Sequence, residues 1–158
     1  MNSRSYEVVV VEAAARSVAG VRADVPFGRV AEYFARCLDL VFAAGRSGAI
    51  ALDGQNIFIY HPGAPGVLVV DFCVGTSGPF AAIGEVSWRQ TPLGTAATTF
   101  HLGDYGGLRG AHDAVHQWCR ERGRTLAGPS WEVYGHWHAD PAKLRTDVYY
   151  LLENRPTG

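Results

Sequence analysis

Residues 103–134 read GDYGGLRGAHDAVHQWCRERGRTLAGPSWEVY, a stretch that predicts one helix followed by one strand. Asp104 precedes the helix and Gly123 ends it. The apolar side chains of this helix recur at amphipathic spacing: Leu108, Ala111, Val115, Trp118 and Cys119. Gly128-Pro129 then turns the chain into residues 131–134, an apolar segment typical of a strand.

The same order of elements is expected earlier in the chain. Strands are predicted at residues 8–11 and 17–21, and the uninterrupted β-branched run of the first indicates burial on both faces. Asp24 and Pro26 predict a helix start, as a capping residue and a first-turn proline. The apolar stripe of that helix consists of Val30, Tyr33, Phe34, Cys37, Leu38 and Val41. Two further strands follow, at residues 57–60 and 67–70.

Two passes of strand, strand, helix, strand, strand therefore span the chain. The second pass has further predicted strands at residues 84–90, 95–102 and 147–152. Tyr60 and Tyr134 end corresponding strands 74 residues apart, and Phe27 and Tyr105 open corresponding helices 78 residues apart. We expect an internal repeat within a single domain of residues 1–158, with repeats at about 6–76 and 84–152. The alternative is that two such passes arise by chance in an α+β protein.

The second pass carries an ordered set of motifs: Gly103-Asp104-Tyr105-x-x-Leu108, a helix, Gly128-Pro129-x-x-Glu132-x-Tyr134, Pro141 and Thr146-Asp147-Val148-Tyr149. This set resembles the GyrI-like small-molecule-binding family, which includes effector-binding domains of some AraC- and MerR-type regulators. The first half is similar through Asp24-Val25-Pro26-Phe27 and through paired strands that end at Tyr60 and Val74. The resemblance covers about residues 6–152.

The resemblance implies an α+β fold of two pseudo-symmetric β-β-α-β-β-like modules of the SHS2 type. These modules would form antiparallel sheets with the helices on one side and a ligand groove between the halves. In regulators this domain is attached to a helix-turn-helix. Here five residues precede Tyr6 and a short polar tail follows Leu152, so we expect a stand-alone form without direct control of transcription.

Composition favours a globular protein, because 47% of the residues are hydrophobic and 18% are charged. The net charge of −1 comes without a basic run, so we expect no direct nucleic-acid binding and no membrane partner. The apolar run at residues 8–11 is too short for the hydrophobic region of a signal peptide or for a membrane-spanning helix. Three separated cysteines, Cys37, Cys73 and Cys119, suit a reducing compartment, and we expect a cytoplasmic protein.

Glu132 is the first candidate for a functional residue. Side chains alternate along a strand, so Glu132 and Tyr134 share one face while Trp131 and Val133 share the other. We expect the apolar pair to pack on the helices, which leaves Glu132 and Tyr134 facing the concave side of the sheet. A carboxylate among aromatic rings can bind a cation, and the resemblance implies that the matching glutamate does so. The alternative is a solvated glutamate, or one paired with Arg145.

Aromatic side chains are the other candidates for ligand contacts. The predicted ligand-binding set is Glu132, Tyr134, Phe58, Tyr60, Trp88, Trp137 and Tyr149. Phe58 and Tyr60 occupy positions in the first half that match Glu132 and Tyr134 in the second. Each of these rings, taken singly, can instead belong to the core.

His112 and His116 lie four residues apart on the predicted helix, a spacing that can hold a metal. Both flank the apolar stripe, so we expect them to contact solvent, and no third ligand is evident. His136 and His138 carry no stronger signal. The sequence contains no GxSxG nucleophile motif and no phosphate-binding GxxxxGK order. We therefore expect no metal and no cofactor.

Two classes of function remain. The first is a binding module for small cationic or aromatic molecules, with a small-molecule ligand as the partner and self-association into a homo-oligomer left open. The second is a hydrolase, because some stand-alone GyrI-like proteins resemble enzymes that open reactive cyclopropane rings with water. Glu132 would then be the general base and Tyr134 a proton donor. A protein-interaction role, as in the gyrase-inhibitor branch, lacks the acidic run that it would need.

Overall fold

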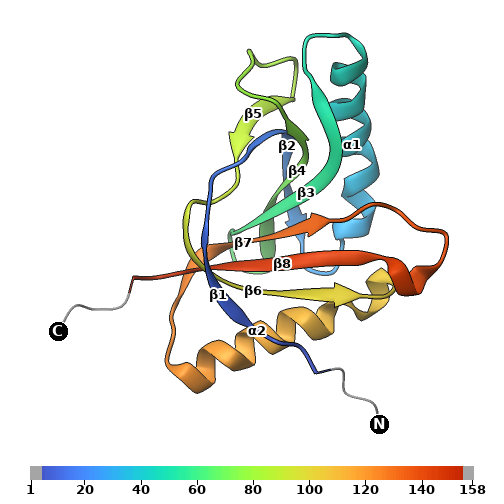
Figure 1. Ribbon diagram of the computed structural model, residues 1–158. Helices are drawn as coiled ribbons and strands as arrows, with labels where there is room; N and C mark the ends of the chain where they lie inside the picture. Colours follow the sequence, from blue (N-terminus) through green and yellow to red (C-terminus); the bar gives the residue numbers. More distant parts are fainter. Residues whose placement is uncertain (1–4, 155–158) are drawn as a thin grey trace. The chain divides into compact units, whose positions relative to one another are not determined.

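The computed structural model describes residues 5–154, which form two compact units (Figure 1). One unit contains residues 14–92, and the other combines residues 5–13 with residues 93–154. The described residues contain two α-helices, and all strand pairs within each unit are antiparallel. The predicted α+β class is confirmed.

The unit of residues 14–92 is a four-stranded sheet with one helix. The strand order is β5 (Ser87–Gln90), β2 (Ser17–Pro26), β4 (Val67–Thr76), β3 (Leu52–Pro62). Helix α1 (Val30–Arg46) packs against β2 and β4. The buried side chains of α1 are Cys37, Leu38, Val41 and Ala44. All of these except Ala44 belong to the predicted stripe.

The predicted start of α1 is wrong. Strand β2 continues to Pro26 and its pairing with β4 includes Asp24 with Val69 and Pro26 with Val67. The sheet ladder therefore holds both residues in an extended backbone, which a helix cannot use. A turn through Gly28, with a φ of 81°, follows, and the helix begins at Val30.

A buried carboxylate on β4 contacts a residue from each of the other three strands of this sheet, on the face opposite α1. Asp71 of β4 is 3% exposed at its side chain and accepts from Arg22 Nε at 2.7 Å. His61 Nε2 lies 3.1 Å away and Arg89 Nε lies 3.4 Å away. Burial alone raises the pKa of Asp71, but the hydrogen bonds from His61 and Arg22 outweigh it and lower that pKa to about 2.

The second unit is also a four-stranded antiparallel sheet with one helix. Its strand order is β1 (Val9–Ala13), β6 (Gly94–Leu102), β8 (Arg145–Leu152), β7 (Leu126–Tyr134). Two short 3₁₀ turns, η1 (Tyr105–Gly107) and η2 (Pro141–Lys143), flank the predicted elements. Helix α2 (Leu108–Arg122) packs on β6 and β8 and ends, as predicted, at Gly123, whose φ is 62°.

Strand β1 differs from the expectation of a strand buried on both faces. It lies at the end of its sheet and pairs with β6 alone. Val9 and Val10 are 45% and 43% exposed. A run of β-branched residues indicates a strand but leaves open whether that strand lies in the centre or at the edge of its sheet.

Each unit takes its edge strand from the other half of the sequence. β1 belongs to the predicted first repeat, yet it pairs with β6 of the second. β5 belongs to the predicted second repeat, yet it pairs with β2 of the first. The order of elements along the chain is the predicted one, whereas the compact units exchange one strand. The pseudo-two-fold relation and the groove stay predictions.

Neither α1 nor α2 has the length and apolar character of a membrane-crossing segment, and no other helix in residues 5–154 does.

Candidate functional site

Glu132 lies two residues before the end of β7 and is 4% exposed. Its Oε2 atom is 2.6 Å from Nε2 of His112, which belongs to α2. Glu132 therefore points toward the helix of its unit, and the predicted orientation away from the helices is wrong. Trp131 points the other way and stacks on Tyr149 of β8, with ring centroids 5.0 Å apart and planes 6° from parallel. Because Trp131 is apolar, the sequence predicted that it would face the helix. The structure instead has Glu132 on that side of the sheet, where it bonds His112 of α2.

A continuous chain of hydrogen bonds runs through Glu132. The Tyr134 hydroxyl donates to Glu132 Oε1 at 2.6 Å. An ionised carboxylate only accepts, so Nε2 of His112 carries a hydrogen and donates to Oε2. The other ring nitrogen, Nδ1, is 2.7 Å from the hydroxyl of Tyr150. That hydroxyl donates to a neutral imidazole and accepts from an imidazolium. These hydrogen bonds connect Tyr134, Glu132, His112 and Tyr150 in series.

The surroundings of this chain of hydrogen bonds restrict its protonation states. Burial, followed by the negative charge of Glu132, raises the pKa of Tyr150 well above its ordinary value. Tyr150 therefore keeps its proton at neutral pH. Burial also lowers the pKa of His116, and the nearby charges of His112 and Arg120 lower it further. His116 is thus neutral at physiological pH, so the charge at this site is set by Glu132 and His112.

The two side chains bonded to the carboxylate, His112 and Tyr134, are rings, and further rings of the same unit pack on them. Tyr105 meets Tyr134 edge to face at 5.6 Å. Tyr150 meets His112 at 5.7 Å and His116 at 4.8 Å, again with tilted planes. A buried negative charge walled by rings can attract an organic cation, and a carboxylate paired with an imidazole can also accept a proton.

The other predicted ligand residues are distributed over both units. Tyr149 lies on the sheet face opposite Glu132, so the structure does not bring these two together. Trp137 follows β7 and is 75% exposed. Phe58, Tyr60 and Trp88 belong to the unit of residues 14–92. Phe58 packs edge to face on Phe72 at 4.9 Å, and the indole of Trp88 donates to Ser17 at 3.1 Å. Their convergence with Glu132 stays a prediction.

Sequence reasoning missed His112 and Tyr150. His112 is 21% exposed at its side chain, so it contacts solvent as expected, but both of its ring nitrogens are also bonded, which the sequence did not show. Helical spacing could have identified it: His112 is four residues after Leu108 and three before Val115, both buried. The described residues contain no group of three metal-ligating side chains.

The family model described as "GyrI-like small molecule binding domain" matches residues 6–153. No curated protein matches the chain.

Solved structures of similar fold cover nearly all of the chain. The EcmrR C-terminal domain has a TM-score of 0.76 at 22% identity, over 95% of this chain and 99% of that one. SAV2435, solved bound to tetraphenylphosphonium, has a TM-score of 0.65 at 14% identity, over 95% and 94% of the two chains. A hydrolase from Listeria innocua has a TM-score of 0.65 at 11% identity, over 93% and 92%. At these identities the similarity shows the fold alone.

Proposed function

We propose that this chain, which belongs to the GyrI-like family of small-molecule-binding domains, binds small organic cations and aromatic molecules through Glu132. The observation that carries the proposal is a carboxylate 4% exposed, held between a strand and a helix by an imidazole and a phenol. SAV2435, which has a similar fold, was solved with an aromatic cation bound, and this supports the same class of ligand.

Burial makes the charge of Glu132 effective. A charge removed from water interacts more strongly with an opposite charge than it does at the surface. His112 offsets part of that charge when it is protonated, and it is a hydrogen-bond donor in either state. An organic cation near Glu132 would take over the role of the imidazolium. Tyr105, Tyr134 and Tyr150 would add ring contacts, each of about 0.5–2 kcal/mol for a cation.

Replacing Glu132 by Gln removes the charge and keeps the side-chain size. We expect tetraphenylphosphonium to bind about 10- to 100-fold more weakly, because the Coulomb attraction between a carboxylate and a cation about 7 Å away is about 2 kcal/mol at an effective dielectric constant of about 20. Neutral triphenylphosphine oxide should bind with unchanged affinity. Titration calorimetry measures both, and Glu121→Gln, an exposed glutamate on α2, is the matched control. Equal affinity of the wild type and Glu132→Gln for the cation would contradict the proposed role of the carboxylate.

A hydrolase is the second candidate, and one feature of the site favours it. Tyr134 is hydrogen-bonded to the same carboxylate that could accept a proton from water. Glu132 would take that proton while the water oxygen attacks a strained ring carbon and the ring C–C bond breaks. Tyr134 would protonate the carbon that leaves with the electron pair. The proton on Glu132 would then return to Tyr134 across the 2.6 Å bond.

Mass spectrometry separates the two functions. Incubation with a cyclopropane-containing electrophile should give a product heavier by one water if the chain is a hydrolase. Glu132→Ala should form none, and Tyr134→Phe should form it more slowly. An absence of adduct across a panel of electrophiles, together with retained binding of cations, would leave binding as the function.

A further inference from the structure

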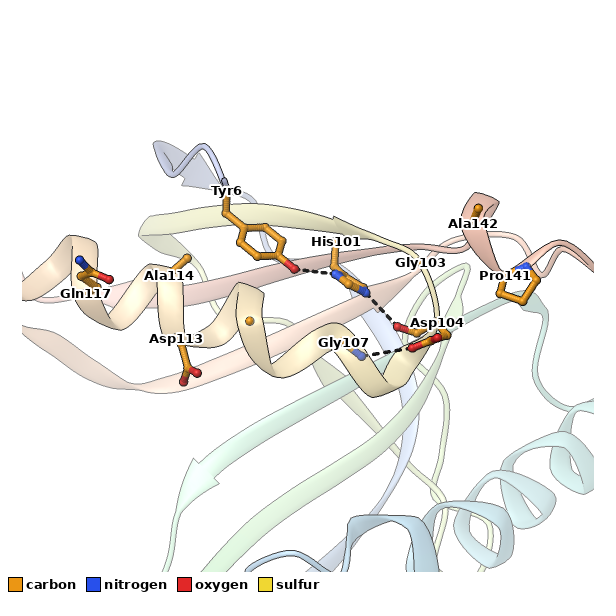
Figure 2. A pocket seen from close by; sticks show the side chains of 11 residues that line it. Tyr6, His101, Gly103, Asp104, Gly107, Asp113, Ala114, Gln117, Pro141 and Ala142 are labelled. Carbon is orange, nitrogen blue, oxygen red and sulfur yellow. Dashed lines mark hydrogen bonds between the residues drawn. The ribbon is translucent and has the colours of Figure 1, made fainter. Parts of the chain in front are cut away.

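A cavity lies on another side of α2 from His112, within the unit that also contains Glu132 (Figure 2). Its volume is about 690 Å³, which is in the range of small-molecule sites. The N-terminal segment, the end of β6, helix α2 and η2 supply its walls. From α2 it is lined by Gly110, Asp113 and Gln117, whereas the site at Glu132 uses His112 of the same helix.

A buried histidine fixes the proton positions on one wall of the cavity. His101 is 3% exposed, and its Nε2 is 2.8 Å from the backbone carbonyl of Asp104. A carbonyl only accepts, so Nε2 carries a hydrogen. The other nitrogen, Nδ1, is 2.8 Å from the Tyr6 hydroxyl, which donates to it when the ring is neutral. Figure 2 shows Tyr6, His101 and Asp104 in one row. With its proton engaged in this way, the Tyr6 oxygen can only accept from a ligand.

Two glycines let this row pack tightly against α2. A Cβ atom on Gly107 would lie 2.9 Å from Cε1 of His101, closer than real contacts allow. A Cβ on Gly110 would lie 3.2 Å from the Tyr6 hydroxyl. Gly107 and Gly110 therefore leave room for the side chains of His101 and Tyr6.

The charges along the cavity have one sign. Asp104 and Asp113 line it, and its lining among the described residues includes no lysine or arginine. Arg109 approaches Asp113 to 3.9 Å, but these side chains are 89% and 70% exposed, so water screens the pair. The Asp104 carboxylate accepts from the Gly107 amide at 3.3 Å, which holds it at the cavity end of the helix.

We propose that this cavity is a second ligand site, specific for an organic cation that carries several N–H donors. Two carboxylates and the Tyr6 oxygen are acceptors, and the Gln117 amide both donates and accepts, so the charged groups of the lining match a guanidinium or primary ammonium and oppose an anion. A cation without N–H groups can supply charge here but no hydrogen bonds. The proposal is independent of the function assigned to Glu132.

Agmatine is a suitable probe, because it carries a guanidinium at one end and an ammonium at the other. We expect saturable binding in titration calorimetry, weakened up to about fivefold by Asp113→Asn or Asp104→Asn, because both carboxylates are exposed and an exposed ion pair contributes about 0.2–1 kcal/mol. Asparagine also caps helical turns, so Asp104→Asn should keep the fold. Asp39→Asn, an exposed aspartate on α1, is the matched control and should change nothing.

Two further comparisons make the result specific to this cavity. Agmatine should shift the backbone amide signals of Gly107 and Gly110 in a heteronuclear NMR titration. Glu132→Gln should leave agmatine binding intact, and the two aspartate variants should leave tetraphenylphosphonium binding intact. The second site would be overturned if agmatine did not bind, or if both aspartate variants bound it as tightly as the wild type. Loss of agmatine binding in Glu132→Gln would overturn it as well.

Discussion

Replacement of His112 by Ala tests whether the buried carboxylate depends on its imidazole partner. The change removes the 2.6 Å bond to Glu132 and the 2.7 Å bond to Tyr150. A hydrogen bond to a charged group contributes about 1.5–3 kcal/mol and a neutral one about 1 kcal/mol. We therefore expect a loss of about 2.5–4 kcal/mol in the free energy of unfolding, a large part of the total stability of a domain.

Guanidinium chloride unfolding, followed by tryptophan fluorescence and circular dichroism, measures this loss. His138→Ala is the matched control, because His138 is exposed, and it should change the free energy of unfolding by no more than about 0.5 kcal/mol. The double variant with Glu132→Gln should lose less than the sum of the two single losses, by about 1 kcal/mol or more, because both remove one contact. A loss below about 1 kcal/mol for His112→Ala would refute the reasoning.

Two further predictions concern burial. Asp71 has a folded-state pKa of about 2, against an ordinary value of 3.8. Its carboxylate therefore stabilises the fold by about 2.5 kcal/mol above pH 3.8, and this stabilisation is lost as the pH falls through 2. Asp71→Asn should flatten the acid limb of a stability-against-pH curve measured by urea unfolding, and an unchanged limb would contradict the assignment. Burial raises the pKa of all three thiols, which belong to Cys37, Cys73 and Cys119. A thiol reagent such as DTNB should therefore react with them only after the protein unfolds. Fast reaction with the native protein would show that the thiols are not buried.

Local periodicity accounts for the features that the sequence predicted well. The stripe of α2 from Leu108 to Cys119 and the stop at Gly123 depend on neighbours within a few residues, and both are confirmed. The strands after each helix are longer in the structure but lie where they were expected. Residue alternation also placed Glu132 and Tyr134 on one face correctly.

Contacts between distant residues account for what the sequence did not show. The direction of Glu132 depends on His112, twenty residues earlier, and on the Trp131–Tyr149 stack that occupies the opposite face. Asp24 and Pro26 look like a helix start until the ladder with β4, more than forty residues later, extends them. The cavity beside His101 depends on the hydrogen bond between Tyr6 and His101, and no local pattern signals a contact across 95 residues.

The exchange of edge strands means that the polypeptide passes from one compact unit to the other twice, between residues 13 and 14 and between residues 92 and 93. Cleavage by a protease between residues 13 and 14 would leave the two units covalently connected between residues 92 and 93. A fragment of residues 6–76 would carry β1 without its neighbour β6 and would lack β5, whereas residues 14–92 retain every strand of their sheet. Fragments intended to fold independently should therefore begin and end at these two boundaries, and not at the boundaries of the predicted sequence repeats.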